Sequence, residues 1–166
     1  MTNLEKFEYV VNHWFLKDGV VYAYKTQKPV IFYGDNGIGH RYNNINYYKK
    51  GARAAVYIHQ AVYMLHHNRP IGEGMVIHHI DGDRLNNHPA NLIELTRKQH
   101  QHIHAYQCDN PLRGISLHNN RLWEFSWYDD NGRHGKYFNG INEAMKFRAE
   151  IEEPFRAELR ALGLDC

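Results

Sequence analysis

Short aromatic and β-branched runs dominate the first fifty residues of the chain. The stretches "EYVVNHWF", "GVVYAYK" and "PVIFYG" are separated by turn signals such as "KDG" and "GDNGIG". This pattern predicts short strands and β-hairpins over residues 8–50. From Arg53 to His67 the apolar positions instead recur every three to four residues, until Pro and Gly in "NRPIGEG" end the pattern. It predicts a helix over residues 53–67.

The middle of the chain predicts a strand, a turn, a second strand and a helix. The apolar runs "GMVIHHI" and "NLIEL" flank the polar turn "DGDRLNNHPA". Thr96 and Gln99 then form a capping box, in which the hydroxyl of Thr96 accepts a hydrogen bond from the amide of Gln99 and the Gln99 side chain reaches back. We expect a helix from about Arg97 to Gln107, followed by a linker that Pro111 helps to define.

The last third of the chain predicts an antiparallel sheet followed by a helix. Trp123, Phe125 and Trp127 alternate with more polar positions, and "DDNG" is a strong hairpin turn. Beyond about residue 142, apolar residues recur at helical spacing. Pro154 interrupts that pattern, so either the helix kinks there or a second helix begins there.

Composition limits the classes of protein to which the chain can belong. It has 166 residues, 43% of them hydrophobic, which suffices for a globular core, and no apolar run approaches the roughly 18 residues of a membrane span. The first residues lack a signal-peptide pattern, so we expect a cytoplasmic protein with no membrane partner. Its two cysteines have neither metal-site nor paired spacing. Residues 1–107 hold 12 basic against 8 acidic side chains, a mild bias that permits a polyanionic partner.

Histidine is the unusual residue type: the chain has 13, of which six lie within residues 76–104. On the capped helix, His100 and His104 are four residues apart and share a face. In the preceding strand His78 and His79 point to opposite faces, so only one of them can face the helix. One strand histidine and two helix histidines would form a three-nitrogen metal site with an open coordination position, as catalytic metals use.

The pattern "HHIDGD…NN…NL…LT…H…H" resembles the HNH motif of the ββα-metal nucleases, most closely that of phage HNH homing endonucleases. The resemblance covers residues 75–107, and more weakly residues 14–72. It implies that His78, His100 and His104 bind a divalent metal ion, that His79 is the general base, and that Asn91 orients His79. Three neutral nitrogens suit Zn²⁺ or Mn²⁺ better than Mg²⁺, and the identity of the ion stays open.

Residues 113–166 resemble the plant ethylene-response-factor (Apetala-type) DNA-binding domain, on the basis of "RGIS", "LWEFSWYDD" and "FNGINEA". That resemblance implies a three-stranded sheet that lies in the major groove of DNA and is backed by one helix. The implied DNA-facing residues of this segment are Arg113, Arg121, Ser126, Tyr128, Arg133 and Lys136. In the first segment, Arg84 and Arg97 are candidates for phosphate contacts, with a plain surface role as the alternative.

The sequence therefore predicts an α+β protein. Residues 1–107 would form the HNH endonuclease domain, with N-terminal hairpins and a helix leading into a ββα-metal core at about 75–107; residues 108–112 would be a linker, and residues 113–166 the DNA-binding domain. The predicted function is site-directed hydrolysis of double-stranded DNA by a monomer or homodimer. One alternative is a non-catalytic DNA-binding protein whose histidines hold structural zinc. Another is a structure-specific or nonspecific nuclease, which would share the active site and differ only in its target.

Overall fold

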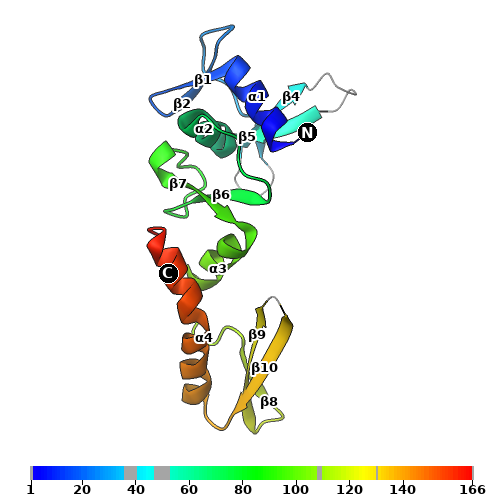
Figure 1. The fold of residues 1–166 in the computed structure, drawn as a ribbon, viewed down its shortest axis with the longest axis vertical. Coiled ribbons are helices and arrows are strands. Elements are labelled where there is room, and N and C mark those ends of the chain that lie inside the picture. The colour runs from blue at the N-terminus through cyan, green and yellow to red at the C-terminus, as the bar shows by residue number, and fades with distance from the viewer. Residues whose placement is uncertain (1, 36–40, 47–52, 108–109, 130, 166) are drawn as a thin grey trace. The chain divides into compact units, whose positions relative to one another are not determined.

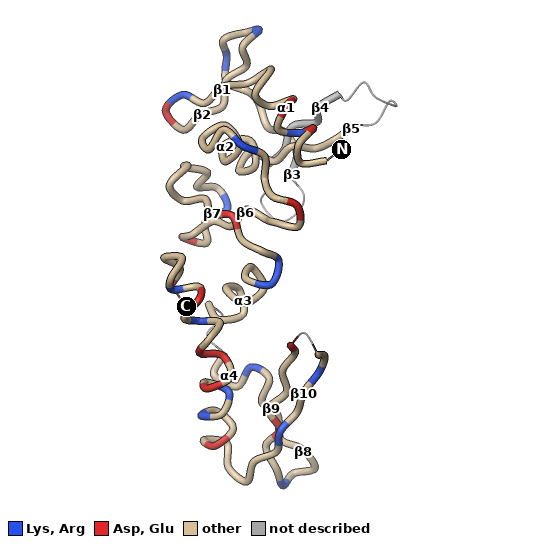
Figure 2. Tube along the Cα trace, viewed as in Figure 1, with Lys and Arg blue, Asp and Glu red and all other residues tan. Residues whose placement is uncertain are grey.

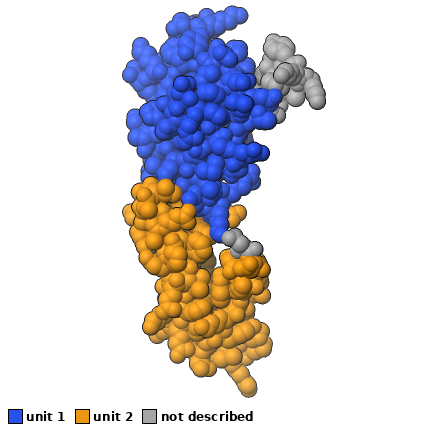
Figure 3. Space-filling view, in the orientation of Figure 1, with its two compact units in different colours: residues 1–100 blue, residues 101–166 orange. Residues whose placement is uncertain are grey.

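The computed structural model of the protein describes residues 2–35, 41–46, 53–107, 110–129 and 131–165. The chain divides into two compact units, residues 1–100 and residues 101–166 (Figure 3). Both units combine helices with small antiparallel strands, which confirms the predicted α+β class (Figure 1). Among the described residues, no helix combines the length and the apolar character that crossing a membrane requires.

The first unit begins with helix α1, Asn3–His13. Thr2 and Glu5 form its capping box: the Thr2 hydroxyl accepts from the Glu5 amide at 3.2 Å, and the Glu5 carboxylate accepts from the Thr2 amide at 2.8 Å. The prediction of a strand over residues 8–13 is therefore wrong. The capping box starts a helix in this segment, and full burial of Val10 on its inner face fixes that helix against the core.

A two-residue hairpin follows, with strand β1, Trp14–Lys17, paired to strand β2, Val20–Ala23. Asp18 and Gly19 form its turn with φ of 51° and 75°, the left-handed values that a tight hairpin of this kind requires. The turn predicted at "KDG" is confirmed. Beyond it, residues 30–33 belong to no strand, and the predicted turn at "GDNGIG" falls largely on residues 36–40, outside the described residues.

A second small sheet contains β3, Gly34–Asp35, β4, Arg41–Asn46, and β5, Arg53–Tyr57. Helix α2 then spans Ile58–His67. The predicted helix over 53–67 is thus correct only from Ile58 onward. Residues 53–57 pair with β4 instead, because ladder hydrogen bonds and the burial of Val56 override the helix propensity of two alanines.

The predicted strand, turn, strand and helix are all present. Strand β6, Met75–His79, pairs antiparallel with β7, Leu92–Thr96, and the short 3₁₀ helix η1, Pro89–Asn91, precedes β7. Helix α3 spans Arg97–Gln107. Its predicted capping box is confirmed, since the Gln99 amide lies 3.1 Å from the Thr96 hydroxyl and the Thr96 amide 2.8 Å from the Gln99 side-chain oxygen.

Glu94 on β7 ties this hairpin to the end of α2. Its carboxylate accepts hydrogen bonds from Arg69 at 2.6 Å, from the Gly72 amide at 2.6 Å and from the Tyr63 hydroxyl at 3.2 Å. Burial raises the pKa of Glu94, but the bonds from Arg69 and Gly72 outweigh burial, so its pKa lies below the ordinary value. The charged form of Glu94 therefore stabilises the position of β7 against the end of α2.

The second unit contains a three-stranded sheet and one long helix. Strand β9, Leu122–Asp129, lies between β8, Ile115–His118, and β10, Gly132–Phe138, and helix α4 spans Ile141–Ala161 through Pro154 without a break. Acidic and basic residues are mixed along α4 (Figure 2). The core of the second unit contains Phe125, Trp123 and Trp127. This confirms the predicted alternation, in which these three residues share one face of β9.

Glu152 on α4 is the centre of a buried ionic cluster in this unit. Its carboxylate accepts from Arg148 at 3.0 Å, from Arg156 at 3.0 Å and from Arg113. The guanidinium groups of Arg156 and Arg113 also lie 4.3 and 5.0 Å from the centre of the Tyr106 ring. The cluster therefore joins the end of α3 and the turn before β8 to α4.

Candidate metal centre and catalytic histidine

The two adjacent histidines of β6 point to opposite faces of the strand, as the sequence predicts. His78 is only 3% exposed, and the centre of its ring lies 5.3 Å from that of His100 on α3. His79 is 4% exposed and its ring lies 5.4 Å from that of His59 on α2. His78 is therefore the strand histidine that faces α3.

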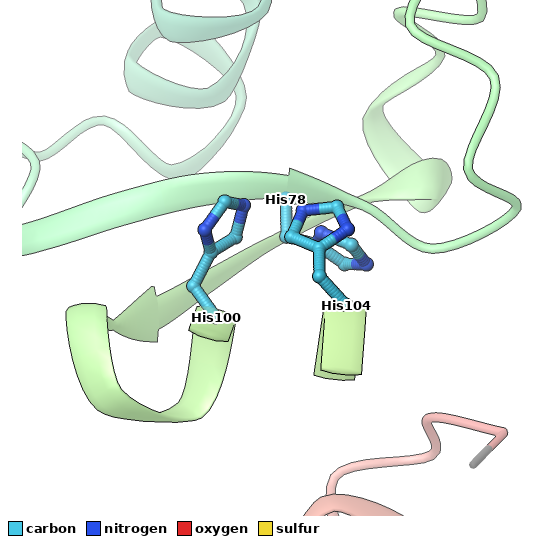
Figure 4. A group of neighbouring side chains, drawn as sticks. All are labelled: His78, His100 and His104. Carbon is cyan, nitrogen blue, oxygen red and sulfur yellow. The ribbon is translucent and has the colours of Figure 1, made fainter. Parts of the chain in front are cut away.

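Helix α3 places His104 one turn after His100. The division between the two units falls within this continuous helix, so the helix itself sets the spacing of the two rings. His78, His100 and His104 each offer one ring nitrogen, and these three atoms lie within 4.8 Å of one another. Figure 4 shows the His100 and His104 rings projecting from the helix toward the strand that carries His78.

This set of three imidazoles fits a divalent cation. Zinc–nitrogen bonds of about 2.1 Å place tetrahedral ligand nitrogens roughly 3.4 Å apart, a spacing that small side-chain rotations can reach from the observed arrangement. His78 is buried, His100 half-buried and His104 exposed. The site therefore opens on one side, which leaves space for a phosphate oxygen or water beside three protein ligands.

An asparagine of the loop after β6 contacts the ring of His79. Oδ1 of Asn87 lies 3.1 Å from Nε2 of His79, and the Asn87 amide group donates to the Leu85 carbonyl at 3.1 Å. Those two contacts agree on the orientation of the amide, with its oxygen toward the histidine. Sequence reasoning missed this contact, because asparagines of a polar turn such as "DGDRLNNHPA" ordinarily cap the turn. The location of Asn87 in the loop that follows His79 is the signal that could have identified the contact.

Asn91 makes its side-chain hydrogen bonds within the same loop. Its Oδ1 accepts from the Asp81 amide at 3.0 Å, and its Nδ2 donates to the Asp81 carboxylate and to the Asn86 carbonyl, both at 2.8 Å. Hydrogen bonds from Asn86 and then from Asn91 hold the pKa of Asp81 below its ordinary value. Asn91 therefore closes the loop, and the amide oxygen that lies against Nε2 of His79 belongs to Asn87.

The candidate DNA-contacting residues occupy different environments. Arg84 is exposed in the loop after β6, Arg97 is exposed at the first position of α3, and Arg121 is exposed in the turn between β8 and β9. Register pairs Arg133 with Tyr128, which places both on the sheet face opposite Phe125. Ser126 shares this outer face, because the side chains of a strand alternate between its two faces.

Two other predicted DNA-facing residues lie elsewhere. Lys136 pairs with the buried Phe125, and its Nζ lies 3.9 Å from the centre of the Phe147 ring on α4. Arg113 binds the carboxylate of Glu152 and stacks on Tyr106. The structure thus places both cations against the helix of their own unit, away from the outer face of the sheet.

Comparison with known proteins gives a family for the central segment. Residues 56–102 match the family model described as HNH endonuclease. This match confirms the resemblance predicted for the histidine-rich segment, which we call the HNH segment. Among solved structures, the chain in "DNA binding and cleavage by the HNH homing endonuclease I-HmuI" is similar, with 20% identity and a TM-score of 0.44, over 81% of this chain and 76% of that one.

No curated protein matches the chain. The comparisons do not support the resemblance of residues 113–166 to the plant ethylene-response-factor domain, although the predicted three-stranded sheet and helix are present. What the second unit binds is therefore a question for experiment.

Proposed function

We propose that the protein is a metal-dependent endonuclease that hydrolyses phosphodiester bonds of double-stranded DNA at a selected site. The observation that carries this proposal is the convergence of three imidazole nitrogens within 4.8 Å, with a fourth histidine next in the chain to one of them. The match of residues 56–102, which contain His78, His79 and His100, to the HNH endonuclease family model supports the assignment of substrate and reaction.

In the proposed reaction His79 acts as the general base. Asn87 Oδ1 accepts the Nε2–H of its ring, which favours the tautomer whose lone pair is on Nδ1. Nδ1 accepts a proton from a water molecule while the water oxygen attacks the phosphorus. The bond from phosphorus to the 3′ oxygen then breaks. A divalent ion held by His78, His100 and His104 would supply Lewis-acid stabilisation of the phosphate and of the leaving 3′ oxygen.

The test is cleavage of supercoiled plasmid DNA with Zn²⁺, Mn²⁺, Co²⁺, Ni²⁺ or Mg²⁺ by the wild type and by His79→Ala. The matched control is His66→Ala, which removes an exposed histidine from the last turn of α2. We expect His79→Ala to lose at least about 100-fold in rate, the contribution of a positioned general base. Equal rates for the two variants would refute the assigned base.

The metal ligands have a separate test in calorimetric titration of the metal-free protein. We expect one ion per chain and at least tenfold weaker binding by His100→Ala and by His104→Ala, with His66→Ala unchanged. A structural zinc site predicts instead that chelation unfolds the protein. Loss of cleavage on chelation with retention of the circular dichroism spectrum supports the catalytic proposal over that alternative.

We further propose that the second unit binds the DNA around the cut site through the outer face of its sheet. Tyr128 is 73% exposed there and Arg133 is its partner on β10, while Arg121 is exposed in the turn between β8 and β9. If Arg121 and Arg133 contact phosphates, each alanine variant reduces the slope of log affinity against log salt by about 1. Unchanged slopes for both would exclude this face from the interface.

A further inference from the structure

His59 is a buried histidine for which the proposed reaction has no use. It is the second residue of α2 and is only 7% exposed. Histidine is intermediate between core and surface residues in its burial, so the packing of one buried imidazole against another calls for a physical reason. The reason that the structure offers is the neighbouring ring of His79.

The ring of His59 makes two contacts, one with Tyr57, the residue before α2, and one with His79, the proposed base. The ring of Tyr57 stacks on that of His59, with centres 5.6 Å apart and planes 15° apart. The ring of His59 meets that of His79 edge to face, with centres 5.4 Å apart and planes 72° apart. Edge-to-face contact depends on the orientation of both rings, so it restricts rotation of the His79 ring.

Asn87 and His59 restrict the His79 ring in different ways. The hydrogen bond that Asn87 Oδ1 accepts fixes one atom of the ring, Nε2, while leaving the plane of the ring able to turn about that contact. The ring of His59 sets the plane. Together they determine the direction of Nδ1, the atom to which we assign proton transfer, and neither contact comes from a metal ligand.

We infer that His59 is a positioning residue that sets the plane of the His79 ring through edge-to-face contact. The inference rests on the proposed function only in the role of His79. It does not invoke a change in the charge of either histidine. Because misplacement of a reacting group by about 1 Å can cost on the order of 100-fold in rate, loss of this ring acts on turnover and leaves DNA binding intact.

The kinetic experiment compares His59→Ala, His59→Leu and His59→Phe in the full-length protein. A hollow of about 240 Å³ lined by His59, Ile71 and Ile77 gives room for the slightly larger phenyl ring. We expect His59→Ala and His59→Leu to lose about 10-fold or more in kcat with unchanged KM for DNA, and His59→Phe to restore kcat to within about threefold of wild type. Equal kcat for the leucine and phenylalanine variants would overturn the inference.

A measurement without DNA or metal separates this inference from the proposed function. In protein labelled with ¹³C-histidine, the ring resonance of His79 is identified by its loss in His79→Ala. We expect a single sharp resonance in wild type and in His59→Phe, and a broadened or doubled one in His59→Leu. A sharp, unshifted resonance in His59→Leu would end the inference even if the protein cuts DNA. A wild type that cuts no DNA with any ion would end the proposed function alone.

Discussion

The cluster around Glu152 gives the sharpest prediction of stability. Glu152→Gln keeps the shape of the side chain but removes the charge that three guanidinium groups share. It also turns one acceptor into a donor, which then faces an arginine N–H. We expect the second unit to lose about 3 kcal/mol of unfolding free energy as a result.

The magnitude follows from the contacts. A hydrogen bond from arginine to the amide oxygen is still charge-assisted but lacks the opposite charge of the carboxylate, so we take a loss of about 1 kcal/mol for each of the three arginines, within the roughly 1.5–3 kcal/mol of a hydrogen bond to a charged group. The side chains of Arg148, Arg156 and Arg113 are 12%, 22% and 27% exposed. Solvent therefore replaces little of the lost interaction, and the sum lies at the lower end of the roughly 3–5 kcal/mol typical of a broken buried pair.

The assay uses the distribution of tryptophan. The chain has three tryptophans, of which Trp14 belongs to the first unit and Trp123 and Trp127 to the second. In a Trp14→Phe background, urea denaturation followed by tryptophan fluorescence reports the second unit. The control is Glu153→Gln on the same helix, whose side chain is 60% exposed and pairs with Arg160. A surface pair contributes at most about 1 kcal/mol, so equal losses from the two variants would refute the reasoning.

Four further outcomes follow from single residues. Asn87→Ala lowers cleavage by roughly 10-fold to 100-fold at unchanged metal affinity, as removal of a ring-orienting contact does, and cleavage kinetics with calorimetry checks it. Asn91→Ala lowers the melting temperature, because it removes three hydrogen bonds that close the loop after β6. The stabilisation from Glu94, whose pKa lies below the ordinary value, is complete above about pH 4.3 and lost as pH falls through the lower folded value. The gap in unfolding free energy between wild type and Glu94→Gln at pH 7 therefore narrows at pH 3 in urea titrations. Gly114→Ala destabilises the second unit by about 2 kcal/mol in the same fluorescence assay, since φ is +74° and the added Cβ would lie 2.9 Å from the Ser126 carbonyl oxygen.

The strand, turn, strand and helix that carry the candidate metal centre could be predicted because each is determined locally. The capping box of Thr96 and Gln99 sets the start of α3, and that start fixes the phase of the helix. His100 and His104 then share a face, and the period of two in β6 leaves one strand histidine toward them. Local rules therefore specify the site, and tertiary packing only brings the hairpin and the helix together.

The errors at the start of α2 and in α1 have different origins. The aromatic and β-branched residues of 8–13 favour a strand locally, yet the capping box of Thr2 and Glu5 nucleates a helix there. Ala54 and Ala55 favour a helix locally, yet pairing with β4 makes them part of a strand. The choice at Ala54 and Ala55 depends on the partner that the segment meets, and hydrophobic spacing does not contain that information. The capping box of Thr2 and Glu5 is instead a local signal, which the prediction from aromatic and β-branched runs did not use.

The directions of the long side chains of Lys136 and Arg113 could not be predicted, because they too depend on tertiary partners. Lys136 lies on the inner face of its sheet, where its ammonium group contacts the ring of Phe147. Arg113 turns to Glu152, a carboxylate 39 residues further along the chain. Family resemblance gave both residues a DNA-facing role. Partners in the folded unit give them a structural one, which leaves the outer face to Tyr128 and Arg133.

The proposed ligand His78 and the proposed base His79 are neighbours in the chain, and the strand that carries them decides where each ring points. In a strand, neighbouring side chains point to opposite faces, so His78 can face α3 while His79 is held by α2 and by the loop after β6. On a helix, neighbours diverge by only about 100° and would compete for the same space. The strand thus keeps the base out of the coordination sphere while it stays one residue from a ligand.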